Sequence, residues 1–330
     1  MKVAIVGATG ATGASIVNGL LESDIQFDIT ALVRPNSIEK SATVALKEKG
    51  IRIVAIDLQG NQDELVAALK GIDIVISAIY YQALQDEIPL STAAKAAGVK
   101  RYVPCFFATI APRGVMKARD DKEEILDHIQ RIYLPYTVID VGWWYQITLP
   151  AVPSGKFDGH LTFANNNIIG GGNNPSALVN LNDIGRYVAV IINDERTINK
   201  KIFAYTESKT QNEIFELVEK VTSEKPERTE VSYIASKRLE QRRQKLIVSS
   251  QMSKEKIEAQ LAQLKSPDEL LQQRAILDYW MSWGVRGDNT ADNAVYLGYV
   301  LAKDLYPSLK GQSLEDFIGD VLDGKVKPVY

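Results

Sequence analysis

Residues 2–13, KVAIVGATGATG, join a short apolar run to three glycines spaced three positions apart. The run predicts a buried strand, and the glycines predict a tight turn that opens a helix. Glycine there permits close backbone approach to a pyrophosphate, and a helix amino end offers free N–H groups and partial positive charge. No Gly-Lys-Ser/Thr follows, so this is not a P-loop. We predict cofactor contacts along this turn, the alternative being a purely structural strand-to-helix turn. The predicted contacts are Gly7, Thr9, Gly10, Ala11, Thr12 and Gly13.

Strand-like and helix-like segments alternate through the first 140 residues, which predicts βαβ units and an α/β fold with a doubly wound parallel sheet. The expected strands are 3–6, 28–33, 51–56, 72–76, 101–103 and 136–139. The expected helices are 11–22, 37–49, 61–70, 83–97 and 117–133. After residue 141 loops dominate, and a polar helical pattern covers about 236–282. We predict a nucleotide-binding core over 1–150 and a smaller, partly helical substrate-binding region over 151–330, with some segments packing back on the core.

Composition narrows the class of protein. The 330 residues carry a net charge of −3, one cysteine and two histidines. These numbers argue against a nucleic-acid partner, a disulfide framework and a histidine-rich metal site. The basic run 237–245 lacks the aromatic residues that stack on bases. No apolar stretch is long enough to span a membrane, and glycines interrupt the first apolar run. We therefore expect a cytoplasmic protein without a bound metal; the sequence specifies neither its substrate nor its oligomeric state.

The residue after the second predicted strand indicates the kind of cofactor. An acidic residue there binds the adenosine ribose, whereas an arginine accommodates a 2′-phosphate. Here the strand ends in Arg34, and Ser37 and Lys40 could donate further hydrogen bonds. The sequence therefore predicts NADP(H) rather than NAD(H). The alternative is that Arg34 is a solvated loop cation.

The helix predicted over 117–133 carries a lysine on its apolar face. The apolar stripe comprises Ile125, Leu126, Ile129, Ile132 and Tyr133. Lys122 projects into the middle of that stripe, close to the strand ends. Partial burial of an amine beside a cofactor suits it to proton transfer near neutral pH, so Lys122 is the candidate catalytic residue. The alternative is a snorkelling lysine that covers apolar surface.

Aromatic pairs follow three of the predicted strands. They are Tyr80-Tyr81, Phe106-Phe107 and Trp143-Trp144. Ligands of open α/β sheets bind at strand ends, in pockets with largely apolar walls. An aromatic substrate or a flat nicotinamide ring would suit such a pocket. We predict an aromatic small-molecule substrate bound by Tyr80, Phe107, Trp143 and Trp144 and also by Phe106, which is predicted to contact the cofactor as well. Each aromatic taken singly is better explained by core packing than by ligand contact, and the prediction rests on the three pairs together.

Several motifs together resemble one family. They are Gly7–Gly13, Leu32–Arg34, Ile74–Ala78, Gly98–Pro104, Leu134–Thr137, Asn182–Tyr187 and Val285–Thr290. In order and spacing they resemble the NmrA-like, isoflavone reductase-like family of atypical short-chain dehydrogenases, and its fungal members in particular. The resemblance implies a Rossmann-like fold, with Ser77 and Ala78 at the cofactor. It also matches Lys122 to the helical lysine that lies thirteen residues before Pro-Tyr-Thr in the plant reductases.

The resemblance implies an activity. Members of this family pass hydride from NADPH to an aromatic or conjugated substrate, and Lys122 would exchange the accompanying proton. Plant members carry Ser-Glu-Phe-Gly where this chain has Cys105-Phe106-Phe107-Ala108, so substrate identity is not carried over. The family also contains regulators that bind NADP(H) without catalysis and generally lack the lysine. We expect an NADPH-dependent oxidoreductase, with such a redox-sensing regulator as the alternative.

Overall fold

The computed structural model describes residues 1–231 and 275–329. Its main sheet has five parallel strands in the order β3-β2-β1-β4-β5. They are β1 (Lys2–Val6), β2 (Asp28–Val33), β3 (Arg52–Ala55), β4 (Ile74–Ser77) and β5 (Arg101–Val103). The strand order reverses at β1, and a crevice forms at the carboxyl ends of strands at such a reversal. The predicted doubly wound parallel sheet is confirmed.

Beyond β5 the sheet is extended by strands from later in the chain. A parallel bridge between Tyr102 and Tyr136 brings in β6 (Thr137–Val141). The next strands outward are β10 (Lys200–Ala204) and β13 (Tyr299–Leu301), both parallel to their neighbours. Two strands that follow residue 150 thus lie in the same layer as the nucleotide-binding core. The domain boundary at residue 150 stays a prediction.

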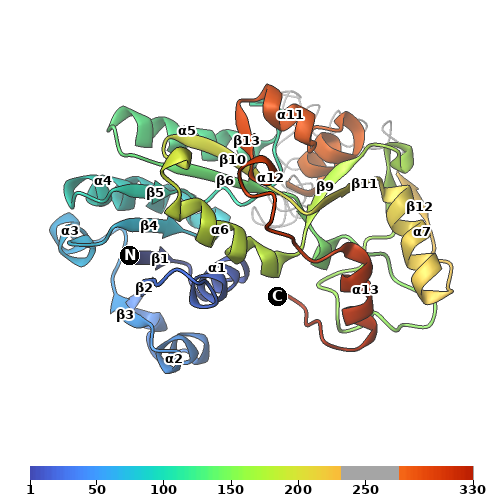
Figure 1. Ribbon diagram of the computed structural model, residues 1–330, viewed down its shortest axis with the longest axis horizontal. Coiled ribbons are helices and arrows are strands. Elements are labelled where there is room, and N and C mark those ends of the chain that lie inside the picture. Colours follow the sequence, from blue (N-terminus) through green and yellow to red (C-terminus); the bar gives the residue numbers. More distant parts are fainter. Residues whose placement is uncertain (232–274, 330) are drawn as a thin grey trace, which may run out of the picture.

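Helices cover both faces of the sheet (Figure 1). Alternate residues of β1 point to opposite faces: Val3 and Ile5 join one buried cluster, and Ala4 and Val6 join the other. The first cluster is covered by α1 (Ala11–Leu21), α2 (Ser41–Glu48) and α6 (Ile184–Asn193). The second is covered by α3 (Gln62–Leu69), α4 (Glu87–Ala96) and α5 (Lys117–Arg131). The short helices η1 (Pro35–Ser37) and η2 (Tyr81–Asp86) follow β2 and β4.

The smaller part of the molecule has its own core. Its strands are β7 (Trp143–Trp144), β8 (Asn167–Ile169), β9 (Ser176–Val179), β11 (Glu207–Lys209) and β12 (Thr229–Val231). Its helices are η3 (Tyr145–Ile147), η4 (Gly170–Gly172), α7 (Gln211–Thr222), the π-helix Trp280–Arg286 and α13 (Leu314–Leu322). Its buried side chains come mainly from α7, α13 and the segment after β7. The remaining elements are η5 (Leu181–Asp183), η6 (Glu195–Thr197), α11 (Ala291–Tyr296) and α12 (Ala302–Leu305).

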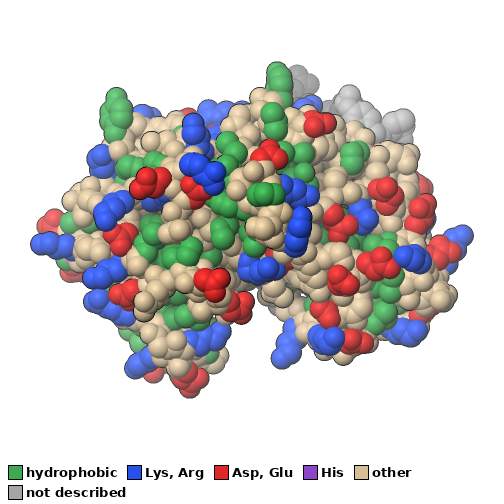
Figure 2. Space-filling model, viewed as in Figure 1, with side chains coloured by type: hydrophobic (Ala, Val, Ile, Leu, Met, Phe, Trp, Pro, Cys, Tyr) green, Lys and Arg blue, Asp and Glu red, His purple; other side chains and the backbone are tan. Residues whose placement is uncertain are grey.

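Two findings bear on partners. None of the helices among the described residues is long and apolar enough to cross a bilayer. On the face shown in Figure 2, acidic and basic side chains are interspersed rather than gathered by sign. The polar helical pattern predicted over 236–282 and the basic run 237–245 fall wholly or mostly outside the described residues. The cytoplasmic location stays a prediction.

Candidate functional site

A cavity of about 580 Å³ lies at the carboxyl ends of β1, β2, β4 and β5, where the strand order reverses. Small-molecule sites have volumes of about 300–1,000 Å³, so this one has room for a cofactor-sized ligand. Most of the residues predicted for the site line this cavity. They are Gly7, Thr9, Gly10, Ala11, Thr12, Arg34, Ser37, Lys40, Ala78, Tyr80, Phe106, Phe107, Lys122 and Trp144. Their roles stay predictions.

Three predicted site residues do not line this cavity. Gly13 lies behind the glycine turn, where a Cβ atom would come within 2.0 Å of the Gly7 carbonyl oxygen. Ser77 is the last residue of β4 and is fully buried, with its side chain beside Glu87 and Tyr102. Trp143 lines a different, smaller cavity. Gly13 therefore supports the turn through packing, and Ser77 and Trp143 lie behind the wall.

The glycine turn requires glycine at positions 7 and 13 on steric grounds. Gly7 has φ +78°, and a Cβ atom on it would lie 2.2 Å from the Ala78 carbonyl oxygen. Gly10 is the N-cap of α1, its N–H donates to the Gly7 carbonyl at 3.0 Å, and it has no side chain to cap the helix. The first turn of α1 contains no acidic residue. The N–H groups of that turn are therefore available to an anion, which the helix dipole favours.

Positive charge gathers on the cavity wall after β2. Arg34 is the N-cap of η1 and Lys40 is the N-cap of α2; both are exposed, and Ser37 lies between them in the sequence. Neither cation forms an ion pair with a carboxylate of the described chain within 4.0 Å, so both are available to a phosphate group. The wall carries no acidic residue at the end of β2 that would bind a ribose hydroxyl instead.

Lys122 enters the cavity from α5. The helix buries Ile125, Leu126 and Ile129, and Lys122 lies on the same face with only 9 % of its surface exposed. Its Nζ donates a hydrogen bond to the carbonyl oxygen of Phe106, in the segment after β5. Among the described residues no carboxylate lies within ion-pair distance of that ammonium group. An amine held by a neutral carbonyl at a cavity wall is free to exchange a proton with a ligand.

The prediction that Tyr133 belongs to the buried apolar stripe of α5 is wrong. Tyr133 is 84 % exposed, because α5 ends at Arg131 and Tyr133 has φ +52° in the turn that follows. The left-handed conformation directs the chain away from the helix axis, so the helical period no longer applies to this residue. The remaining members of the stripe are buried or half-buried.

A buried ion pair lies beneath Phe106. The Arg119 guanidinium contacts Asp140 at 2.9 Å and lies 5.2 Å from the centre of the Phe106 ring. Burial alone would lower the pKa of Arg119, but the buried Asp140 carboxylate raises it well above its usual value. Arg119 therefore stays charged, and its charge is neutralised locally. The pair stabilises the Phe106 side of the cavity without contributing a titrating group.

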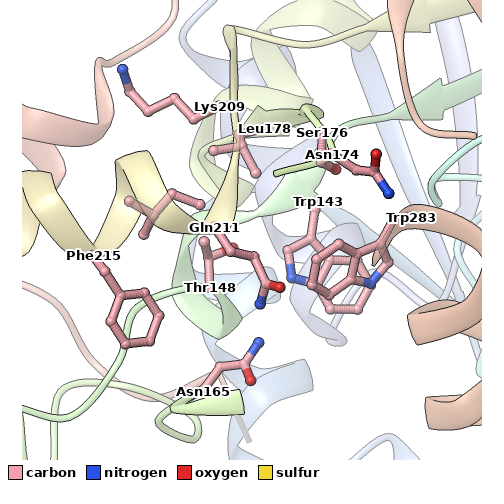
Figure 3. Close-up of a pocket in the computed structure, with 11 residues that line it drawn as sticks. Trp143, Thr148, Asn165, Asn174, Ser176, Leu178, Lys209, Gln211, Phe215 and Trp283 are labelled. Atoms are coloured by element: carbon pink, nitrogen blue, oxygen red, sulfur yellow. The ribbon is translucent and has the colours of Figure 1, made fainter. Parts of the chain in front are cut away.

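The two tryptophans of β7 point in opposite directions, as successive side chains of a strand do. Trp144 lines the large cavity, and Trp143 lines a cavity of about 10 Å³, which has room for about one water molecule. Figure 3 shows Trp143 beside Trp283 on the wall of this small cavity, with Asn165 across from them. Tyr279 lies 5.2 Å from Trp143 and also lines the large cavity. Sequence reasoning missed Tyr279, because no spacing in its polar helical surroundings distinguishes it.

A doubly wound parallel sheet, a glycine turn after its first strand and a cavity where the strand order reverses define a Rossmann-like α/β protein. The NmrA-like family model matches residues 1–272, and the chain belongs to the NmrA-like family. The resemblance seen in the sequence is thereby confirmed. Among residues 1–231 and 275–329, no group of three or more His, Cys, Asp or Glu is arranged to hold a metal ion.

Characterised relatives match most of the chain. The protein named asnovolin J 5′,6′-dehydrogenase nvfM, from Aspergillus novofumigatus, is 46% identical over 328 residues, which cover 98% of this chain and 96% of that protein. Pinoresinol reductase 1 from Arabidopsis thaliana is 31% identical over 253 residues, covering 70% and 77%. The structure of the leucoanthocyanidin reductase–NADPH complex from Vitis vinifera matches with a TM-score of 0.75 at 20% identity, covering 98% and 100%. The last comparison supports the fold.

Proposed function

We propose that this protein is an NADP(H)-dependent oxidoreductase that transfers hydride between the cofactor and a conjugated or aromatic small molecule. The observation that carries the proposal is that one cavity is lined by the glycine turn, by Arg34 and by Lys122. The first two suit a phosphorylated dinucleotide, and the third suits proton transfer. The names of the relatives, a dehydrogenase and a reductase, describe the two directions of such chemistry.

The residues of the cavity fit a dinucleotide with an additional phosphate. At Gly7 a Cβ atom would clash with the Ala78 carbonyl, so glycine lets the turn after β1 lie directly against the segment after β4 at the edge of the cavity. The N–H groups at the start of α1 would bind the pyrophosphate, and Arg34, Ser37 and Lys40 would bind a 2′-phosphate. When bound, the cofactor supplies or accepts the hydride.

Lys122 would donate or accept the proton that accompanies hydride transfer. As the conjugated carbon gains hydride, negative charge develops on the attached enolate or phenolate oxygen, and Lys122 Nζ donates a proton to it. In the oxidative direction the neutral amine accepts that proton. The Phe106 carbonyl orients Nζ, and the rings of Phe107 and Trp144 provide apolar wall for a flat substrate. Trp143, which lies behind this wall, would act on the substrate only through its contact with Tyr279.

The test is Lys122→Met, assayed for NADPH oxidation and NADP⁺ reduction with isoflavones, pinoresinol-type lignans and conjugated ketones. We expect kcat to fall by about 10²-fold or more, the usual contribution of a proton-transfer group, with NADPH affinity within a few-fold of wild type. Lys117→Met is the matched control, because Lys117 lies on the same helix, is half-exposed and pairs with Asp121. Full activity in Lys122→Met would remove the lysine from the mechanism. NADPH binding without turnover on any substrate would favour a cofactor-sensing protein.

A further inference from the structure

Glu87, the first residue of α4, is a fully buried carboxyl group. Its side chain has no exposed surface, and no Lys or Arg of the described chain lies within 4.0 Å of it. One oxygen accepts a hydrogen bond from the Cys105 backbone N–H at 3.0 Å, and the other accepts one from the Tyr102 hydroxyl at 3.0 Å. Burying a carboxyl group is costly, and these two hydrogen bonds offset part of that cost.

The contact to Cys105 connects Glu87 to the proposed site. Cys105 is followed directly by Phe106, whose carbonyl oxygen accepts the hydrogen bond from Lys122 Nζ. The Cys105 thiol is held as well, by the Ile79 carbonyl at 3.1 Å. The chain between the carboxylate and the ammonium group is therefore a single short stretch of backbone, fixed at both ends. That stretch, from Cys105 to Phe107, also lines the large cavity.

Charge couples the same two groups. Burial raises the pKa of Glu87 to about 7, against the hydrogen bonds from Cys105 and Tyr102 and the positive charge of Lys122, which lower it. Burial also raises the pKa of the Cys105 thiol to about 11 and that of Tyr102 well above its usual value, so both are neutral near pH 7. The described residues that face Glu87 from neighbouring elements are Ser77 of β4, Tyr102 of β5, Cys105 after β5, and Lys122 of α5. Lys122 is the charged residue among them.

We propose that Glu87 is a positioning residue for Lys122: its carboxylate holds the Cys105 peptide, and its negative charge retains the Lys122 ammonium group at the Phe106 carbonyl. The proposal rests on the function proposed above. One consequence is a dependence on pH. Below about pH 7 the protonated carboxyl still accepts from the Cys105 N–H through its carbonyl oxygen but loses its charge, so Lys122 is held less firmly.

The first experiment follows Glu87 by NMR in the full-length protein without cofactor or substrate. Because coupling between two groups is reciprocal, removing the charge of Lys122 must raise the pKa of Glu87. In Lys122→Met we expect the ¹³Cδ titration of Glu87 to move up by about one pH unit, with no shift in Lys117→Met. In wild type, the Cys105 amide resonance should titrate with the same midpoint. The proposal would be overturned if the pKa of Glu87 were the same in Lys122→Met as in wild type, or if the chemical shift of the Cys105 amide did not change with pH.

The second experiment separates charge from hydrogen bonding. Glu87→Gln keeps an acceptor for the Cys105 N–H without the charge, whereas Glu87→Leu removes both. We expect hydrogen exchange at the Cys105 amide to stay near the wild-type rate in the glutamine variant and to rise at least about tenfold in the leucine variant. The reverse order would refute the positioning role. If Glu87→Leu does not fold, the glutamine variant decides through its turnover: the inflection near pH 7 in kcat should vanish while NADPH affinity stays unchanged.

The NMR and turnover measurements also show separately whether this proposal or the proposed function fails. Coupling seen by NMR in a protein that oxidises no NADPH would leave the positioning of Lys122 intact and refute the oxidoreductase. Turnover of NADPH without coupling between Glu87 and Lys122 would support the oxidoreductase and refute the positioning role of Glu87. Tyr102→Phe is a further control, because it removes one hydrogen bond to Glu87 and leaves the bond to Cys105. In that variant we expect the pKa of Glu87 to rise while the Cys105 amide stays protected from exchange.

Discussion

The contact between α1 and α6 makes one perturbation especially informative. The two helices approach at glycines: a Cβ atom on Gly185 of α6 would lie 1.9 Å from the Ser15 carbonyl oxygen of α1. The Ser15 hydroxyl joins the helices through bonds to the Leu181 carbonyl and the Gly185 N–H, at 2.6 and 3.0 Å. Since the obstructing atoms are backbone, no side-chain rotation relieves the clash in Gly185→Ala. The helices have to move apart by about 1.5 Å to reach ordinary contact near 3.4 Å.

The magnitude follows from two opposing effects. Replacing glycine by alanine inside a helix contributes about 1 kcal/mol of stability, whereas overpacking a tight contact costs about 1–3 kcal/mol and occasionally more. We place Gly185→Ala at the upper end of that cost, because backbone meets backbone, and expect a net loss of about 2 kcal/mol. Gly319 in α13 is the matched control, since a Cβ atom there would meet no heavy atom within 4 Å. Gly319→Ala should gain about 0.5–1 kcal/mol.

Urea unfolding of wild type and both variants, followed by circular dichroism, measures these changes. NADPH titration adds a functional readout, because α1 carries the glycine turn at its amino end and a displaced α1 should weaken binding. The two variants should move in opposite directions, by about 3 kcal/mol in total. Equal midpoints for Gly185→Ala and wild type, or a loss of stability in Gly319→Ala, would refute the argument from close approach.

Three further predictions concern the cavity and its surroundings. Arg34→Ala should weaken NADPH binding about 10- to 100-fold, the loss of a charge-assisted phosphate contact, and leave NADH binding unchanged in fluorescence titrations; equal losses for both cofactors would contradict a 2′-phosphate role. Gly7→Ala should abolish NADPH binding and destabilise the fold by about 3 kcal/mol or more, since its Cβ would meet the Ala78 carbonyl at 2.2 Å and a positive φ; thermal unfolding checks this. The free energy of unfolding of wild type, taken relative to that of Glu87→Gln, should fall by about 3 kcal/mol as pH rises from 4.5 to 7, because the folded state favours the protonated Glu87 carboxyl. Urea unfolding of both proteins at several pH values measures this difference, and a difference that does not vary with pH would refute the raised pKa.

Much of the site could be predicted because its parts are local. The turn at Gly7, the cation Arg34 and the inward Lys122 each follow from a short pattern: a strand end, a residue after a strand, and a helical period. The sheet then brings them together, because parallel strands end at one edge. Glu87 and Tyr279 could not be found this way. Their surroundings in the sequence are ordinary. Glu87 is buried against Tyr102 and Cys105 of the next strand and the segment after it, and Tyr279 reaches the cavity wall beside Trp143; no local period indicates either contact.

The two tryptophans of β7 mark the limit of sequence reasoning at the strand ends. Both follow a predicted strand, and both were assigned to one pocket. The period of two residues sends Trp144 to the large cavity and Trp143 to the small one, and which side holds which cavity depends on the packing of the π-helix against β7.

By itself the sequence determined the alternation of strands and helices up to α5, the glycine turn and the family, because these depend on local period and on the sterics of a few residues. Only the tertiary structure decided that β10 and β13 extend the large sheet, that Trp143 leaves the main cavity, and that Glu87 lies buried against the Cys105 peptide. The physical reason is the range of the interactions. Helical and strand periods are set by neighbours within a few residues, whereas strand pairing and burial of a charge depend on groups that only the folded chain brings together.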